Sequence, residues 1–324
     1  MTVKTLTRLC AAATVATLAL GSQTAFAADK VKVAGSQKGN WATAMVVWAE
    51  QQGYFKAENL EVEVVWTSGG SDAQQAVISG AAQIAPQTGT LGIVSAFAKG
   101  APVRIIGASM TGSGGLYWYV RKDSKLTSLK DVPEGTTLSF SRPGSSTNLV
   151  AAALKQHYHS KAKLVSAGSS TATMTQVMSG QLDIGWASPP VGLDKIKSGE
   201  IRIIANGDDS PTVSSQTIRV HAVNANWLKA NPDVAKRFMR AMWKGHQYAY
   251  TPEGMKAYSK FSKLPLDIVE AVSKFATLKN FSYWPVGGLD QTIKDAIANK
   301  RLKKPLTKAQ LDELVQVVYK PEMK

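Results

Sequence analysis

The sequence predicts an α/β protein of two lobes built on one plan, and three features of the 324-residue chain indicate this. Short β-type segments alternate with helical ones, an order typical of sheets flanked by helices. The sequence also matches itself at an offset of about 100 residues. Its 44% hydrophobic and 19% charged residues are typical of a chain that folds around a core.

The N-terminal segment is typical of a secretory signal peptide. Lys4 and Arg8 precede a short apolar stretch, and the small residues of Ala25-Phe26-Ala27 mark a cleavage site. The stretch is shorter than the roughly 20 apolar residues that span a bilayer. We therefore expect residues 1–27 to be removed and the mature chain to be exported and soluble.

The single cysteine, Cys10, lies within that segment, so the mature chain has none. A lipid-attachment cysteine follows the apolar stretch, whereas Cys10 precedes it. We therefore expect neither a lipid anchor nor a disulfide, and a fold that depends on its core alone.

The mature chain is basic, with 36 basic and 23 acidic residues left after Lys4 and Arg8 are removed, a net charge of +13. The basic residues are scattered, apart from a short cluster around residues 300–304. Export also separates the protein from nucleic acid, which we exclude as a partner. The excess positive charge instead favours anions.

The first half of the mature chain begins with strand–helix units. Segments of β-type composition are expected to be strands at residues 31–34, 60–66 and 83–85. The helix after the first strand carries Trp41, Met45 and Trp48 on one face and stops at Gly53. A second helix is expected over residues 71–79.

Two blocks of internal similarity support lobes of one design. Val77, Ser79, Gly80 and Ile84 recur 100 positions later as Val177, Ser179, Gly180 and Ile184. The loop at residues 36–40 aligns with residues 141–145 at an offset of 105, each after a strand and before a helix. A repeated structural unit explains both matches most simply.

The C-terminal third is expected to be helical. Asn231-Pro232 is a typical helix start, and Val234, Phe238 and Met242 follow at helical spacing. Residues 281–288 form an aromatic, Gly-rich loop. It either packs over one lobe or edges the space between the lobes, and the sequence leaves both open.

Four helix entrances are candidate ligand-binding segments. They are Gly39-Asn40-Trp41, residues 68–72, Thr88-Gly89-Thr90 and Gly144-Ser145-Ser146-Thr147. Each lies where a strand ends, the edge at which open α/β sheets bind ligands. Free N–H groups in the first turn of a helix favour an anion there.

The last of these segments, residues 144–147, has the residues best suited to binding an anion. Ser145 or Ser146 suits the helix N-cap, the hydroxyls add donors, and Arg142 adds charge. The alternative is that this segment only caps the helix and contacts no ligand. Trp186 follows an expected strand, where it either walls a pocket or lies in the core.

No catalytic, metal or cofactor site is expected. The sequence lacks a G-x-S-x-G elbow, an H-E-x-x-H motif and a mature cysteine nucleophile. Gly112-Ser113-Gly114-Gly115 leads into an expected strand rather than a helix, so it is not a nucleotide loop. We expect it to connect the lobes.

Several short segments together resemble one known family. They are residues 36–39, 53–56, 68–70, 79–84, 99–103, 120–124, 144–146 and 179–183. Over residues 31–250 the chain resembles periplasmic solute-binding proteins of ABC importers. It is most similar to the group for aliphatic sulfonates, taurine and nitrate, which overlaps proteins that resemble thiamine-pyrimidine synthesis proteins.

The resemblance implies a two-lobe, type II periplasmic binding protein fold, in which each lobe has a central, mostly parallel sheet flanked by helices. The chain crosses between lobes twice. Lobe 1 would comprise residues 28–115 and 220–324, including the extra C-terminal helices, and lobe 2 residues 116–219. The hinge would lie near residues 115–119 and 219–223.

The resemblance also implies the ligand-binding residues. They are Gln37, Asn40, Trp41, Gly70, Ser71, Thr88, Gly89, Thr90, Gly144, Ser145, Ser146, Thr147 and Trp186, and the local chemistry described above adds Arg142. This chain departs from sulfonate binders in two places. Residues 88–91 replace a Pro-rich run, and Ala187-Ser188 replaces an acidic residue, so the identity of the ligand stays open.

By this resemblance the protein is not an enzyme. It is expected to be a periplasmic monomer that captures a small organic anion, a sulfonate or carboxylate, and delivers it to a membrane permease. No cofactor or metal is implied. Trp41, Trp118 and Trp186 leave a neutral aromatic or pyrimidine-like ligand open, and a protein of this fold can instead present its ligand to a membrane sensor.

Overall fold

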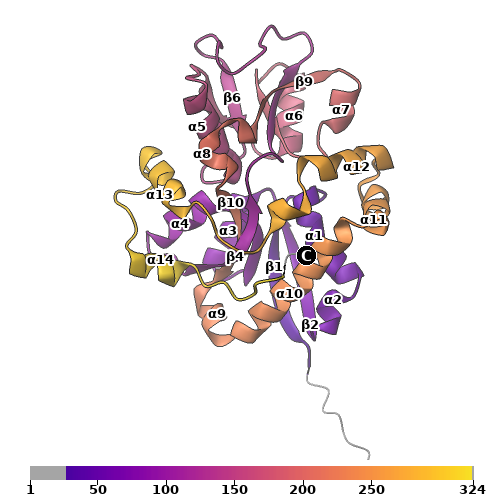
Figure 1. Cartoon of the computed structure of the whole chain (residues 1–324), viewed down its shortest axis with the longest axis vertical. Helices are drawn as coiled ribbons and strands as arrows, with labels where there is room; N and C mark the ends of the chain where they lie inside the picture. The colour runs from indigo at the N-terminus through magenta and orange to yellow at the C-terminus, as the bar shows by residue number, and fades with distance from the viewer. Residues whose placement is uncertain (1–26, 323–324) are drawn as a thin grey trace, which may run out of the picture.

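The computed structural model describes residues 27–322, so the predicted signal peptide, apart from Ala27, lies outside the described part. Figure 1 shows two α/β lobes arranged along the long axis of the molecule. The predicted two-lobe α/β fold is therefore confirmed. In the described part, no helix is long and apolar enough to cross a membrane.

Lobe 1 is built on a five-stranded sheet of order β2-β1-β3-β10-β4. The strands are β1 (Asp29–Ser36), β2 (Leu60–Thr67), β3 (Ile84–Gly89), β4 (Val103–Thr111) and β10 (Thr217–Asn224). Four helices connect its first strands: α1 (Trp41–Gln51), α2 (Tyr54–Ala57), α3 (Gly70–Ile78) and α4 (Thr90–Phe97). β1 runs parallel to β2 and β3, whereas β10 runs antiparallel to β3 and β4.

Lobe 2 contains five shorter strands: β5 (Tyr117–Arg121), β6 (Thr137–Phe140), β7 (Lys163–Ser166), β8 (Gly185–Ala187) and β9 (Ile201–Asn206). β6 and β7 pair in parallel, while β5 is antiparallel to both β8 and β9. The helices are α5 (Ser146–His157), α6 (Ser170–Met178), α7 (Leu193–Lys197) and α8 (Pro211–Ser214), with the short turn η1 (Gly207–Asp209). The sheets are thus mixed and not mostly parallel as predicted, because β5 and β10, the strands that follow the two crossings, run antiparallel to their neighbours.

The internal sequence match corresponds to equivalent elements in the two lobes. α3 and α6 end at Ser79 and Ser179, and each is followed by a glycine at a φ of +79°. That left-handed conformation strongly favours glycine, which explains why the residue recurs. At the other offset, Asn40 and Ser145 are the N-caps of α1 and α5.

The two crossings between the lobes are bonded to each other. The backbone N–H and the hydroxyl of Ser113 both donate to Oδ1 of Asp208, at 2.6 and 2.9 Å. Gly207 lies directly against the carbonyl of Ser113, where a side chain would not fit. As predicted, the Gly112–Gly115 segment links a strand of each lobe, β4 and β5.

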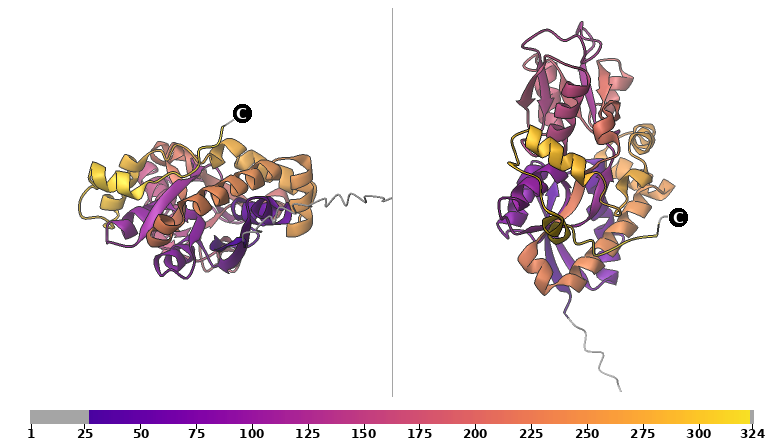
Figure 2. Two further views of the ribbon diagram at one scale, coloured as in Figure 1. Left: turned by 90° about the horizontal axis from the view of Figure 1, so that it is seen from below. Right: turned by 60° about the vertical axis from the view of Figure 1, so that its left-hand side comes forward.

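The remaining helices return to lobe 1. They are α9 (Ala225–Ala230), α10 (Pro232–Ala249), α11 (Pro252–Ser262), α12 (Leu266–Phe275), α13 (Leu289–Ala298) and α14 (Lys308–Leu314), with η2 (Leu278–Phe281) between α12 and α13. α10 buries the predicted Val234, Phe238 and Met242, and Phe238 stacks on Phe55 of α2. Figure 2 shows this C-terminal part, in orange to yellow, lying along lobe 1 and reaching the level where the lobes meet.

The aromatic loop at residues 281–288 packs on lobe 1. Phe281 and Tyr283 are buried, and the carbonyl of Tyr283 accepts the N–H of Ala108 in β4 at 2.9 Å. Trp284 is 44% exposed and carries the ammonium of Lys320 over its ring. Of the two positions that the sequence left open for this loop, packing over one lobe is therefore the one observed.

Candidate functional site

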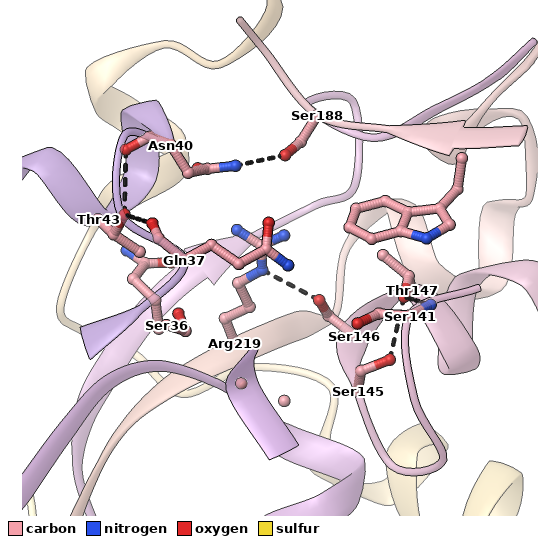
Figure 3. Close-up of a pocket in the computed structure, with 14 residues that line it drawn as sticks. Ser36, Gln37, Asn40, Thr43, Ser141, Ser145, Ser146, Thr147, Ser188 and Arg219 are labelled. Carbon is pink, nitrogen blue, oxygen red and sulfur yellow. Dashed lines mark hydrogen bonds between the residues drawn. The ribbon is translucent and has the colours of Figure 1, made fainter. Parts of the chain in front are cut away.

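A polar cavity of about 40 Å³ lies between the two lobes. Since about 10–15 Å³ of such space holds one water molecule, the cavity suits a compact group of a few atoms. Lobe 1 supplies Ser36, Gln37, Asn40, Thr43, Gly70, Gln87, Gly89 and Arg219, and lobe 2 supplies Ser141, Ser145, Ser146, Thr147, Trp186 and Ser188. Figure 3 shows these residues facing one another across the cavity.

The cavity forms where α1, α3, α4 and α5 begin. Asn40, Gly70, Gly89 and Ser145 lie at the starts of these helices and all line it. The first N–H groups of a helix have no partner inside the helix, and the helix dipole makes that end positive. Four such ends from both lobes therefore point toward one small space.

The structure brings together many of the residues expected from the sequence. Those that line the cavity are Gln37, Asn40, Gly70, Gly89, Ser145, Ser146, Thr147 and Trp186. Six others lie outside its lining: Trp41, Ser71, Thr88, Thr90, Arg142 and Gly144. In each case a contact elsewhere in the fold occupies the side chain or main chain.

Trp41 belongs to the core of lobe 1. Its indole N–H donates to the hydroxyl of Tyr250 at 3.1 Å, and its ring packs edge-on against Tyr250 and Tyr258. The side chain is 1% exposed. Helical spacing had already placed Trp41 on the face shared with Met45 and Trp48, which are also buried.

Thr88 and Thr90 hold lobe 1 together. Their hydroxyls donate to the carbonyls of Val220 and Thr217 in β10, at 3.2 and 2.5 Å. Thr90 is also the first residue of α4, so no separate loop exists at this point.

Three further residues act between the lobes without lining the cavity. The hydroxyl of Ser71 donates to the carbonyl of Pro143 at 3.3 Å, and Arg142 forms an ion pair with Asp72 at 3.4 Å. Gly144 has a φ of +87° and packs against α4. The charge predicted for the site from Arg142 is thus used in a contact between lobes.

The cation on the cavity wall is Arg219, a residue of β10 that the sequence had suggested only as part of the hinge. Its side chain lies between Gln37 of lobe 1 and Ser146 of lobe 2 (Figure 3). Burial lowers the pKa of Arg219 to about 10, and no carboxylate of the described part contributes. The guanidinium therefore remains charged near neutral pH without a counter-ion.

Ser146 connects that cation to α5. The Nε–H of Arg219 donates to Oγ of Ser146 at 3.0 Å. Since this bond uses the oxygen as acceptor, the hydroxyl proton is left to donate to a ligand. Ser145 has a different part, because its Oγ accepts the N–H of Asn148 and so caps the helix.

Trp186 lies on the wall of the cavity and, in the described part of the chain, has an unpaired donor. The side chain is 2% exposed and lines the cavity, and its indole N–H has no hydrogen-bond partner among the described residues. An unpaired buried N–H is costly, so a group that accepts it is favoured. Both possibilities that the sequence left open therefore apply, because Trp186 is part of the buried core and also lines the cavity.

Hydrogen bonds between the lobes close the cavity on one side. Nδ2 of Asn40 donates to Oγ of Ser188 at 2.7 Å, and Oγ of Ser170 donates to Oε1 of Gln37 at 3.5 Å. A larger groove of about 630 Å³ lies next to these residues and is lined in part by Lys38, Gly39, Thr171 and Pro190. The two bonds thus stand between a small inner cavity and a wider outer groove.

The chemistry of the cavity favours a small anion. No acidic side chain lines it in the described part of the chain, whereas an arginine, several hydroxyl side chains and helix N-termini do. Within residues 27–322, no group of three or more His, Cys, Asp or Glu side chains is placed to hold a metal ion. The arrangement can bind and orient an anion without altering it.

Comparison with known proteins gives a family and a fold. The profile of the NMT1/THI5-like family matches residues 40–254. No curated protein matches the sequence. Many solved structures match this chain, and the three described below have low sequence identity to it.

Two of these structures belong to proteins with stated ligands. The alkanesulfonate-binding protein SsuA from Xanthomonas axonopodis pv. citri, bound to MOPS, is 16% identical with a TM-score of 0.73, and covers 90% of this chain and 99% of its own. The periplasmic nitrate-binding protein NrtA from Synechocystis PCC 6803 is 12% identical with a TM-score of 0.70, and covers 89% of this chain and 86% of its own.

A third similar structure comes from Candida albicans and is described as having the generic periplasmic binding protein fold. It is 17% identical with a TM-score of 0.73, and covers 91% of this chain and 98% of its own. At these identities the similarity concerns the fold, which is the periplasmic binding protein fold.

Proposed function

The chain belongs to the NMT1/THI5-like family, and from that premise we propose that it is the solute-binding component of an ABC importer, specific for a small organic anion. A sulfonate or a carboxylate head group would lie in the cavity between the lobes. The protein would act by binding, not by catalysis. The alkanesulfonate-binding protein SsuA and the nitrate-binding protein NrtA have the same fold and bind anions, which supports this proposal.

The observation that carries the proposal is the isolated charge of Arg219. A buried cation without a partner costs several kcal/mol in desolvation. The lining of the cavity offers no carboxylate in the described part, so a bound anion would supply the missing charge. The hydroxyl of Ser146 would then donate to the same anion.

A neutral aromatic ligand has less support. Trp41 lies in the core, and Trp118 is buried with its indole N–H bonded to the carbonyl of Ser139 at 2.8 Å. Of the three tryptophans that suggested such a ligand, Trp186 alone lines the cavity. One indole beside an unpaired guanidinium favours an anion.

The proposal includes the setting in which the protein works. It would be exported to the periplasm, lose residues 1–27, and act as a monomer that delivers its ligand to a membrane permease. Residues 28–115 and 217–324 would move as lobe 1 and residues 116–216 as lobe 2. The boundary predicted at residue 219 shifts because β10 pairs with β3 and β4 of lobe 1 from Thr217 on. The hydrogen-bonded crossings at Ser113 and Asp208 support a hinge between them.

A thermal-shift comparison of matched anions and neutral molecules tests the proposal. Methanesulfonate and acetate should raise the melting temperature of the mature protein, because a ligand that binds only the folded state stabilises it. Methanesulfonamide and acetamide, which have similar shapes without the charge, should have little effect. A neutral compound that stabilises the protein as strongly as its anion would contradict the proposal.

A further inference from the structure

Gly89 lies where the main chains of the two lobes approach each other closely. It ends β3, precedes α4, and is opposed across the sheet by Arg219 of β10. A Cβ atom at this position would lie 2.7 Å from the carbonyl oxygen of Gly144, 2.8 Å from the nitrogen of Ser146 and 2.9 Å from the carbonyl carbon of Ser145. All three are main-chain atoms of lobe 2, and real Cβ atoms essentially never come within 3.0 Å of another atom.

The backbone of Gly89 does not itself require glycine. Its φ of −67° and ψ of 124° are open to any residue. Across the interface, Gly144 has a φ of +87°, which does favour glycine. The constraint on Gly89 therefore comes from the other lobe, and it exists only while the lobes are in contact.

This contact and the anion site form together. Because the main chains meet at Gly89, the N-terminus of α5 comes close enough for Oγ of Ser146 to accept from Arg219 at 3.0 Å. A methyl group at residue 89 would need the gap to widen from 2.7 Å to the 3.4 Å at which ordinary contact begins. That displacement would stretch the Arg219–Ser146 bond as well.

We propose that the missing side chain of Gly89 permits the lobes to close fully and so positions Ser146 against Arg219. The inference deepens the proposed function, since closure would complete the site for the anion. The steric statement itself does not depend on which ligand binds. Gly89→Ala should therefore hold the lobes apart without disturbing lobe 1.

Gly69→Ala is a matched control. Gly69 also lies in lobe 1 and faces lobe 2, but its added Cβ would be 3.4 Å from Oγ of Ser141 and 3.7 Å from Nε2 of Gln37, which is ordinary contact. Its φ of 169° is extended backbone that alanine adopts. The two variants add the same methyl group to the same interface, and only one of them clashes.

Closure can be followed through an ion pair outside the cavity. Lys197 of lobe 2 and Asp267 of α12 meet at 2.5 Å, and their side chains are 66% and 56% exposed. The mature chain has no cysteine, so Lys197→Cys with Asp267→Cys creates a unique pair. A short bis-maleimide would join the two thiols when the lobes are closed, with or without an anion.

The cross-linking rate should fall in the Gly89→Ala background by about 5- to 150-fold, the change in closed population that corresponds to the ~1–3 kcal/mol cost of overpacking. The Gly69→Ala background should match the parent. Rates are measured in a chloride buffer without organic anion and again with methanesulfonate, and melting temperatures verify that all variants fold.

Equal rates in the Gly89→Ala and parent backgrounds would overturn the inference, as would an equal loss in Gly69→Ala. A parent that never cross-links in either condition would also overturn it, because the contact requires closed lobes. Failure of methanesulfonate to bind while the rates differ as expected would count against the proposed function alone.

Discussion

Single side chains in the cavity divide into those that contact a ligand and those that hold the cavity in shape. Arg219 and Ser146 bring hydrogen-bond donors to the wall of the cavity, and Trp186 lines it as well. Ser145, although adjacent to Ser146, uses its oxygen to cap α5. Neighbouring serines therefore have different functions, and the difference can be measured.

Replacing each serine by alanine should separate the two functions. Ser146→Ala should weaken binding of the anion roughly 10- to 150-fold, the range for loss of a hydrogen bond to a charged group, with little change in stability. Ser145→Ala should lower the free energy of unfolding by about 0.5–2 kcal/mol through loss of the cap. Calorimetric titration and urea unfolding of both variants measure the two effects, and the reverse pattern would contradict the assignment.

The same residues show where sequence reasoning stops. Arg142 was expected at the site because it precedes the Gly144–Thr147 segment, whereas Arg219, 73 positions from Ser146, is the residue that reaches it. A weak signal was present, since Arg219 is a single charge in a strand whose other residues are mostly apolar. Nothing local in the sequence pairs β10 with β3.

Whole elements were more predictable than individual contacts. The start of α10 at Pro232 and its buried stripe followed from local rules of capping and spacing. The matching ends of α3 and α6 followed from the internal similarity. The order of strands in each sheet depends on long-range packing, which no short segment of sequence specifies.

Elements packed behind the site carry two buried histidines, His221 in β10 and His246 in α10. Burial lowers the pKa of His246 to about 3. Burial, and to a smaller extent the nearby His246, lowers the pKa of His221 well below its usual value. Both are therefore neutral in the folded protein, while the unfolded chain takes up protons below a pH of about 6.5.

The protein should accordingly lose stability in acid. Since the folded pKa values are depressed, this stability is complete above pH ~6.5 and is lost as the pH falls toward the folded values, by up to about 1.4 kcal/mol per pH unit for each histidine. Neither ring nitrogen of His221 has a partner in the described part, so His221→Phe should fold and show a shallower decline. Urea unfolding of the parent and of His221→Phe at pH 7 and pH 5 measures how much stability each protein loses in acid. An equal loss in both proteins would contradict the assignment to His221.

At the scale of the whole molecule, the two lobes are joined by contacts on both sides of the cavity. Asn40 with Ser188, Asp72 with Arg142, and Lys197 with Asp267 all connect lobe 1 to lobe 2. An anion held by Arg219 and Ser146 would add a contact available only in this closed arrangement. Such a ligand shifts the protein toward the closed form by the affinity gained there.

The central claim is that Arg219 supplies the charge that binds the anion, and calorimetric titration with methanesulfonate tests it most directly. Arg219→Gln should reduce the affinity at least roughly 10-fold, because it removes a charged hydrogen-bond donor. Arg142→Gln removes the same charge from a half-exposed ion pair outside the cavity and should change the affinity no more than about fivefold. Affinity that survives Arg219→Gln, or that depends on Arg142 instead, would contradict the account.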